Sequence, residues 1–163
     1  MTVTDGQAST SSNFTVTVAC QLNITKLQAK LNFAKANADS CTVKGTFDLP
    51  ADYSFADKLA TLEVGDVEVS FTLGSKGSGR TGLSTFKKPT YNKKTGLWMF
   101  SATLKNGSWQ TAWAEYSMIN SNIPKPGVPV TDLPVIFVLD TEAFMGTTNL
   151  HYTAKQGKSG TAK

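Results

Sequence analysis

The sequence predicts an all-β protein: a β-sandwich or barrel-like fold, built from two related halves, with one short α-helix near residues 109–118. Composition is the first reason. Charged residues make up 17% of the chain against about 25% in an average soluble domain, and Thr, Ser, Asn and Gly replace them. Thr favours strands, while Asn and Gly favour turns. The second reason is strict alternation of apolar and polar residues, as in residues 14–19, which is typical of a strand with one buried face.

The first predicted strands lie at the N-terminus. Residues 2–4 alternate in the same way as residues 14–19, and Asp5-Gly6 supplies turn chemistry between them. A lone pair of strands is marginal in water, so we expect this pair to belong to a larger sheet. No signal peptide precedes the pattern, which indicates a fragment of a longer protein.

The next stretch predicts two hairpins. Residues 23–49 read as a strand, a turn and a returning strand, because apolar residues alternate on both sides of a polar segment. Residues 60–73 read as a second hairpin, since Gly65-Asp66 at its centre suits a type I′ turn. The glycine-rich residues 74–82 are expected to form a flexible loop.

The second half of the chain repeats this plan. Residues 31–49 align with residues 89–106, and residues 70–79 align with residues 151–160. Neither half could close its own core, so we expect the two sheets to pack together in one compact domain. The predicted halves are residues 21–87 and 88–163.

An insertion in the second half predicts the helix. Ser108 is a suitable N-cap for residues 109–118, which show the i, i+3, i+4, i+7 spacing of one apolar helical face. That face consists of Trp109, Ala112, Trp113 and Tyr116.

Proline follows the predicted helix. Four prolines predict an extended, polyproline-like connection: Pro124, Pro126, Pro129 and Pro134. The apolar run over residues 135–139 then reads as a strand that is buried on both faces or lies under the helix.

Two stretches resemble bacterial extracellular proteins. Residues 2–18 (TVTDGQASTSSNFTVTV) resemble the last two strands of bacterial immunoglobulin-like and cadherin-like repeats, which implies that residues 1–20 are the tail strands of such a repeat. Residues 22–163, with KLNFAK-like and YTAKQGKSG segments, resemble the C-terminal modules that follow such repeats. The resemblance implies a secreted or cell-surface location beside neighbouring domains of the parent chain. A non-catalytic structural or adhesive module is the function that fits this placement.

The ligand-binding hypothesis rests on the aromatic residues. Planar rings can stack on sugar rings at the water interface, which makes a carbohydrate-binding module the alternative function. Packing against a sheet is the competing role, and it is the expected one for the two helical tryptophans. The candidate residues are Tyr91, Trp98, Trp109, Trp113 and Tyr116.

Catalysis is not expected. His151 is the only histidine, and alternation places it on the strand face opposite Leu150 and Tyr152, where an exposed structural histidine is the simpler interpretation. The chain has no GxSxG nucleophile elbow. Few carboxylates could form an acid–base pair, and the candidates are Glu115, Asp132, Asp140 and Glu142.

No cofactor or metal is assigned. Two cysteines without a CxxC pair and one histidine are too few ligands for zinc. Asp5 and Asp66 lie in Asp/Gly turns without the acidic run of a calcium loop. Cys20 and Cys41 could form a disulfide contributing about 3 kcal/mol, or could be two buried free thiols.

The charged residues limit the classes of binding partner that we expect. Sixteen basic residues against twelve acidic ones give a net charge of +4, but Arg80 is the only arginine, which disfavours nucleic acid. No apolar run reaches the roughly 18 residues of a membrane span, so we expect no membrane insertion. A polysaccharide or cell-wall polymer is the expected partner. Lysines in turn-like segments could be solvated or could attract an anionic polymer: Lys87, Lys88, Lys93, Lys94, Lys155, Lys158 and Lys163.

Overall fold

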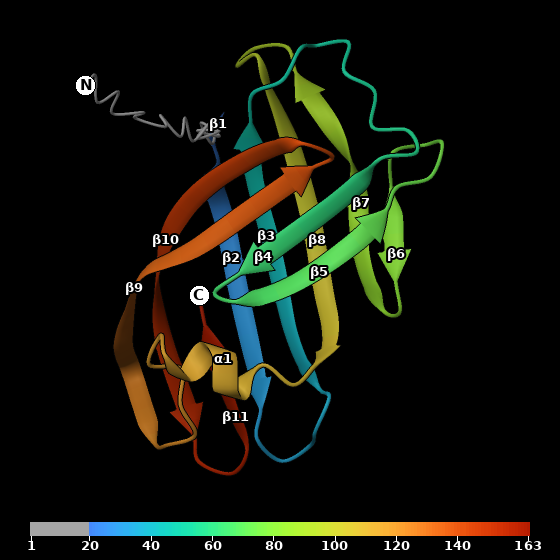
Figure 1. Cartoon of the computed structure of the whole chain (residues 1–163). Helices are drawn as coiled ribbons and strands as arrows, with labels where there is room; N and C mark the ends of the chain where they lie inside the picture. The colour runs from blue at the N-terminus through green and yellow to red at the C-terminus, as the bar shows by residue number, and fades with distance from the viewer. Residues whose placement is uncertain (1–19) are drawn as a thin grey trace, which may run out of the picture.

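The computed structural model describes residues 20–163, and β-strands dominate it (Figure 1). The all-β class predicted from composition and alternation is confirmed, and the strands predicted within residues 1–19 lie outside the described residues. The elements are β1 (Cys20–Gln21), β2 (Asn23–Asn32), β3 (Asp39–Phe47), β4 (Leu59–Val64), β5 (Val67–Thr72), β6 (Gly79–Thr81), β7 (Ser84–Asn92), β8 (Leu97–Gly107), α1 (Gln110–Ala114), β9 (Ile123–Leu139), β10 (Glu142–Lys155) and β11 (Ser159–Ala162).

All of these strands belong to one sheet that curls around a single core. Its order is β5-β4-β9-β10-β11-β2-β3-β8-β7-β6, with β1 beside β10. The pairings are antiparallel, except that β1 runs parallel to β10. The two ends of the order approach each other at a bridge between Leu73, just after β5, and Gly79 at the start of β6. Figure 1 shows β4 and β5 crossing in front of β3 and β8.

The strand order follows the same plan in two halves. When β2–β6 are matched in order with β7–β11, each strand pairing corresponds to another pairing of the sheet, or to itself in the case of β3–β8 and β4–β9. The counterpart of β10–β11 is the bridge between Leu73 and Gly79. Hairpin β2–β3 corresponds to β7–β8, and hairpin β4–β5 corresponds to β9–β10. The pairs β3–β8 and β4–β9 join the two sets. One set gives way to the other between Thr81 and Ser84, while domain limits at residues 87 and 88 stay a prediction.

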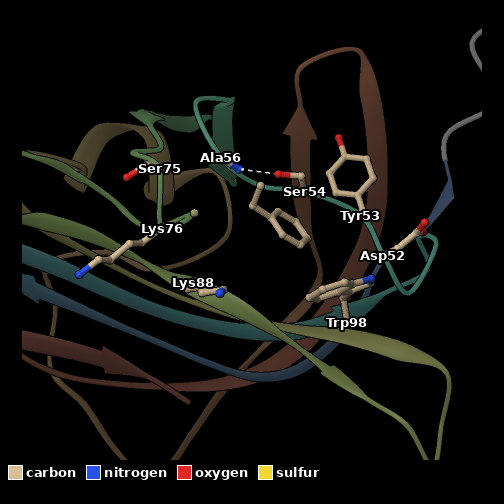
Figure 2. A pocket seen from close by; sticks show the side chains of 10 residues that line it. Asp52, Tyr53, Ser54, Ala56, Ser75, Lys76, Lys88 and Trp98 are labelled. Carbon is tan, nitrogen blue, oxygen red and sulfur yellow. Dashed lines mark hydrogen bonds between the residues drawn. The ribbon is translucent and has the colours of Figure 1, made fainter.

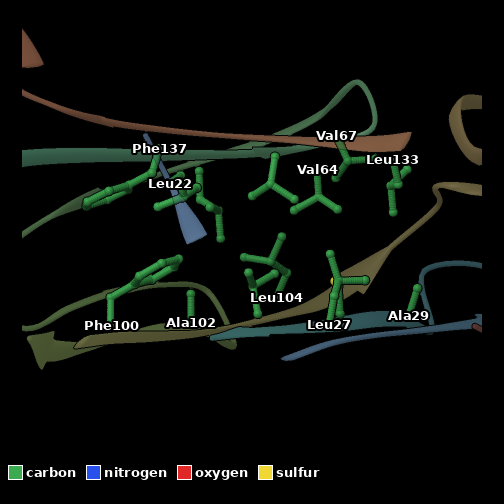
Figure 3. Close-up of a cluster of buried hydrophobic side chains, with 14 of the residues drawn as sticks. Leu22, Leu27, Ala29, Val64, Val67, Phe100, Ala102, Leu104, Leu133 and Phe137 are labelled. Carbon is green, nitrogen blue, oxygen red and sulfur yellow. The ribbon is translucent and has the colours of Figure 1, made fainter. Parts of the chain in front are cut away.

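Alternation on each strand builds the core. Along β3, Cys41, Val43 and Phe47 are buried while Thr42 and Lys44 face outward. Each fully buried large apolar side chain contributes about 1.5–3 kcal/mol relative to an exposed one. Side chains of two facing layers point toward one another in Figure 3, with Val64, Leu133 and Phe137 on one side and Leu27, Phe100 and Leu104 on the other.

The type I′ hairpin predicted at residues 60–73 is confirmed. Val64 pairs with Val67, which leaves a two-residue turn. Gly65 and Asp66 both have positive φ, at 50° and 63°, as this turn type requires. Glycine suits the first position for a second reason: a Cβ there would lie 2.7 Å from a methyl group of Leu133.

The helix is confirmed but is shorter than predicted, and its N-terminus differs. α1 begins at Gln110, and its N-cap is Trp109, which makes no side-chain capping bond. The Ser108 hydroxyl instead donates to the amide oxygen of Asn37 and accepts the Asn37 backbone N–H. A contact between distant segments therefore replaces the local cap.

Two segments that the sequence indicated to be irregular form strands in the structure. The proline-rich stretch belongs to β9, whose residues from Ile123 to Leu139 pair with β10. Proline is tolerated there because the ladder contains register shifts and because proline keeps its carbonyl acceptor. The glycine-rich loop contains β6, in which Arg80 pairs with Thr85 of β7.

The disulfide alternative is wrong, because Cys20 and Cys41 are both free thiols, and of the two only Cys41 is buried, whereas Cys20 is exposed. Cys20 lies in β1 and lines a hollow together with Thr46 and Phe47 at the far end of β3. Cys41 lies on β3 five positions before Thr46, which is about 16 Å along a strand. A disulfide requires Cα atoms within about 7 Å.

Candidate functional site

The five candidate aromatic residues fall into two groups at opposite ends of the molecule. Trp98 is the second residue of β8, and Trp109 lies two residues beyond its last residue, Gly107. β8 is 11 residues long, which corresponds to roughly 35 Å of extended chain. Figure 1 shows α1 at one end and the start of β8 at the other. The five rings therefore do not form a single platform for a sugar chain.

The group at α1 is mainly structural. Trp113 is 0% exposed, and its indole N–H donates to the Val64 carbonyl at 2.9 Å. Packing, rather than ligand contact, is thus its role. Trp109 packs on Trp113 with ring centroids 5.1 Å apart and is half-buried. The half-buried Tyr116 donates its hydroxyl to Asp66 at 3.3 Å, and partial burial followed by this carboxylate raises its pKa.

The group at the other end is larger than the sequence indicated. Trp98 is 8% exposed, and its indole N–H donates to the Pro50 carbonyl at 3.0 Å. The ring of Phe55 meets Trp98 edge-on at 4.8 Å between centroids, and Tyr53 meets Phe55 at 5.1 Å. Tyr91 lies on another side of Trp98 at 5.3 Å. Four aromatic rings thus form one cluster.

This cluster forms a wall of an open pocket of about 280 Å³, which we call the end pocket. The connection between β3 and β4, the loop after β5, and strands β7 and β8 all contribute to it. Figure 2 shows Tyr53 and Trp98 on one side and Lys76 and Lys88 on the other. The pocket is lined by Asp52, Tyr53, Ser54, Phe55, Ala56, Ser75, Lys76, Gly77, Lys88 and Trp98.

The sequence prediction missed most of these residues. Trp98 was a candidate, but Tyr53 and Phe55 lie in the irregular connection between β3 and β4, where no periodicity marks them. A dense Tyr-Ser-Phe group next to Pro50 was the available signal. Nothing in the local sequence links that group to Lys76 or Lys88, because only the folded sheet brings the three segments together.

An ion pair lies beside Tyr53 of the end pocket, and two lysines that line the pocket have no ion-pair partner among the described residues. The ammonium group of Lys58 pairs with Asp140 and lies 5.5 Å from the centre of the Tyr53 ring. Hydrogen bonds from Lys58 and then from the Leu59 backbone hold the pKa of Asp140 below its usual range. Lys76 and Lys88 have no carboxylate partner within residues 20–163.

The residues considered for catalysis are dispersed. His151 is exposed on β10, with its backbone paired to Lys163, and its ring makes no hydrogen bond within the described part of the chain. Asp140 is bound to Lys58, and Asp132 uses its backbone N–H to bind Asn149. Among residues 20–163, no three His, Cys, Asp or Glu side chains gather closely enough to hold a metal ion.

Comparisons of the chain with protein-family models, curated proteins and solved structures found no match. Over the described residues, no helix combines the length and the hydropathy that crossing a bilayer requires.

Proposed function

We propose that this chain is a non-catalytic adhesive module of a secreted or cell-surface bacterial protein, and that it binds carbohydrate in the end pocket. The observation that carries the proposal is the aromatic wall of Tyr53, Phe55 and Trp98 beside an open pocket. Aromatic faces accept the C–H side of a sugar ring, while hydroxyl and ammonium groups around them bind its oxygens.

The construction of the pocket supports a binding role. Phe55 and Trp98 are buried and packed edge-on, so they support the half-buried Tyr53 from behind. The indole of Trp98 is fixed by its bond to Pro50. On the side of Lys88 and Trp98 the pocket stands on the paired strands β7 and β8, and fixing that side costs little entropy when a ligand binds.

The location rests on composition and on the resemblance of residues 22–163 to modules of bacterial extracellular proteins. A composition rich in Thr, Ser and Asn, with charged residues at 17% of the chain, is compatible with that setting. Antibody labelling of intact cells of the source organism would test it, and labelling only after lysis would overturn it.

The binding test is a glycan array followed by calorimetry with the glycan that the array selects. Tyr53→Ala should weaken binding roughly tenfold, because it removes the one ring of the wall that is not buried. Tyr116→Ala is the matched control, since it removes the same side chain at the opposite end and should leave affinity unchanged. An array without any bound glycan, or equal affinity of the Tyr53 variant and the native chain, would refute the proposal.

A further inference from the structure

A second surface of the molecule is formed by strands whose outward charged side chains are all positive. It is the outer face of β2, β3, β8 and β7, extended at one edge by β6, and we call it the lysine face. The register of these strands shows which outward side chains stand next to one another. Adjacent strands lie about 4.8 Å apart, so side chains in register form rows across the sheet.

One row begins with two lysines side by side. Lys26 of β2 pairs with Lys44 of β3, which pairs with Ser101 of β8, which in turn pairs with Lys87 of β7. All three lysines are exposed. Like charges directly opposite each other across a strand pair are destabilising. The Lys26–Lys44 pair therefore works against the stability of the free protein.

The neighbouring rows continue the pattern. Lys30, Ser40 and Lys105 stand in register across β2, β3 and β8, about 13 Å further along the strands. Between these two lysine rows lies a row of Thr and Gln side chains that ends at Thr85 and Arg80. The lysines and Arg80 are exposed, and the hydroxyls between them are half-buried. The result is a set of cation rows with hydroxyl groups between them.

Carboxylates are excluded from this face. Strands β2, β6, β7, β8 and β11 contain no Asp or Glu, and the one acidic residue of β3, Asp39, points into the core. Glu63 and Glu68 pair on β4 and β5, which form part of the opposite layer. The other acidic side chains of the described residues lie on β9 and β10, after α1 and in the connections. Six of the basic side chains therefore lie on strands that present no carboxylate on this face: Lys26, Lys30, Lys44, Arg80, Lys87 and Lys105.

We propose that the lysine face binds a linear anionic polysaccharide through its carboxylate or sulfate groups. An extended polyanion neutralises the lysine repulsion, and the hydroxyls between the cations can bind sugar oxygens. Nucleic acid fits less well, because this face offers no aromatic ring for base stacking and a single arginine. A lipid surface also fits less well, because Met99 is the only large exposed apolar side chain on these strands. The surface is separate from the end pocket and does not depend on a ligand there.

The test measures binding of the full chain to polygalacturonate, to dextran sulfate and to neutral dextran. Binding to one or both anionic polymers and none to dextran is the expected result, and the two anionic polymers distinguish carboxylate from sulfate recognition. The affinity should fall roughly tenfold or more between 50 and 200 mM NaCl, because several ion contacts are lost together. Equal binding of neutral dextran would overturn the proposal.

The triple variant Lys44→Gln, Lys87→Gln and Lys105→Gln should lose most of this binding. These lysines are exposed, so the variant should fold, which circular dichroism would verify. Tyr53→Ala should bind the polyanion as the native chain does, which separates this surface from the end pocket.

A matched control removes the same charge elsewhere. Lys93→Gln, Lys94→Gln and Lys158→Gln change exposed turns outside the lysine face and should leave polyanion binding nearly unchanged. Equal losses in the two triple variants would show attraction by net charge alone and would overturn the proposal. So would tighter binding of single-stranded DNA than of either anionic polysaccharide, or a stable dimer that covers the lysine face.

Discussion

Replacing Asp39 by asparagine should destabilise the fold by about 2–4 kcal/mol, although the side chain hardly changes in size. Asp39 is the first residue of β3 and is 1% exposed. Its carboxylate accepts the backbone N–H of Asn32 at 2.7 Å through one oxygen and that of Trp109 at 2.7 Å through the other. It thereby ties the end of β2 to the segment that leads into α1.

The magnitude follows from these two bonds. A hydrogen bond to a charged acceptor contributes about 1.5–3 kcal/mol, and a buried donor left without a partner costs about 1–3 kcal/mol. Asparagine keeps one acceptor oxygen, but its amide NH₂ replaces the other. One backbone N–H therefore loses its acceptor and faces another donor.

Urea unfolding followed by tryptophan fluorescence at pH 7 measures the effect. Asp48→Asn provides the control, since it makes the same chemical change at an exposed position just beyond β3 and should alter the free energy of unfolding by less than about 0.5 kcal/mol. If Asp39→Asn falls within that same limit, the carboxylate does not anchor these segments and the reasoning fails.

Three further predictions concern the core, the thiols and the acid dependence. Trp113→Ala should lower the free energy of unfolding by about 3–5 kcal/mol, because the ring is fully buried and bonded to Val64, and a loss below about 2 kcal/mol would contradict its core role. A thiol reagent should label exposed Cys20 rapidly and Cys41 only on unfolding, since burial raises the pKa of Cys41 to about 12; two rapidly labelled thiols would contradict this. The lowered pKa of Asp140 means that its bond to Lys58 stabilises the fold above the usual carboxyl range and that this contribution is lost as the pH falls below about 4. Asp140→Asn should therefore show a shallower loss of stability in acid, and a curve identical to that of the native chain would rule this out.

Local patterns in the sequence were sufficient for several of the strands and for one turn. Alternation identifies which residues of a strand face the core, as Cys41, Val43 and Phe47 do in β3. Gly65-Asp66 identifies the hairpin turn because few residues adopt positive φ. The spacing of Trp109 and Trp113 predicted a helix, and the structure keeps five residues of it. Such features depend on neighbouring residues, so one sequence is enough to predict them.

The candidate site was not predictable in this way. Tyr53 and Phe55 have no period, and their partner Trp98 lies on a strand of the other half. The same limit applied to β6 and to the proline-rich part of β9. These segments are strands because they pair with β7 and β10, and the local sequence does not reveal those partners. Ser108 is a suitable cap by local rules, yet it bonds to Asn37 from a distant turn.

The sequence by itself determined an all-β chain, the inward face of the strands that show alternation and a surplus of lysine over acidic residues. The tertiary structure alone decided that Lys26, Lys44 and Lys87 share one row and that an aromatic wall faces Lys76 and Lys88. The physical reason is that alternation fixes the side of a strand on which a residue lies, but not the neighbour of that strand. Strand order and register are set when the whole sheet buries its apolar face, and they bring residues far apart in the sequence into contact.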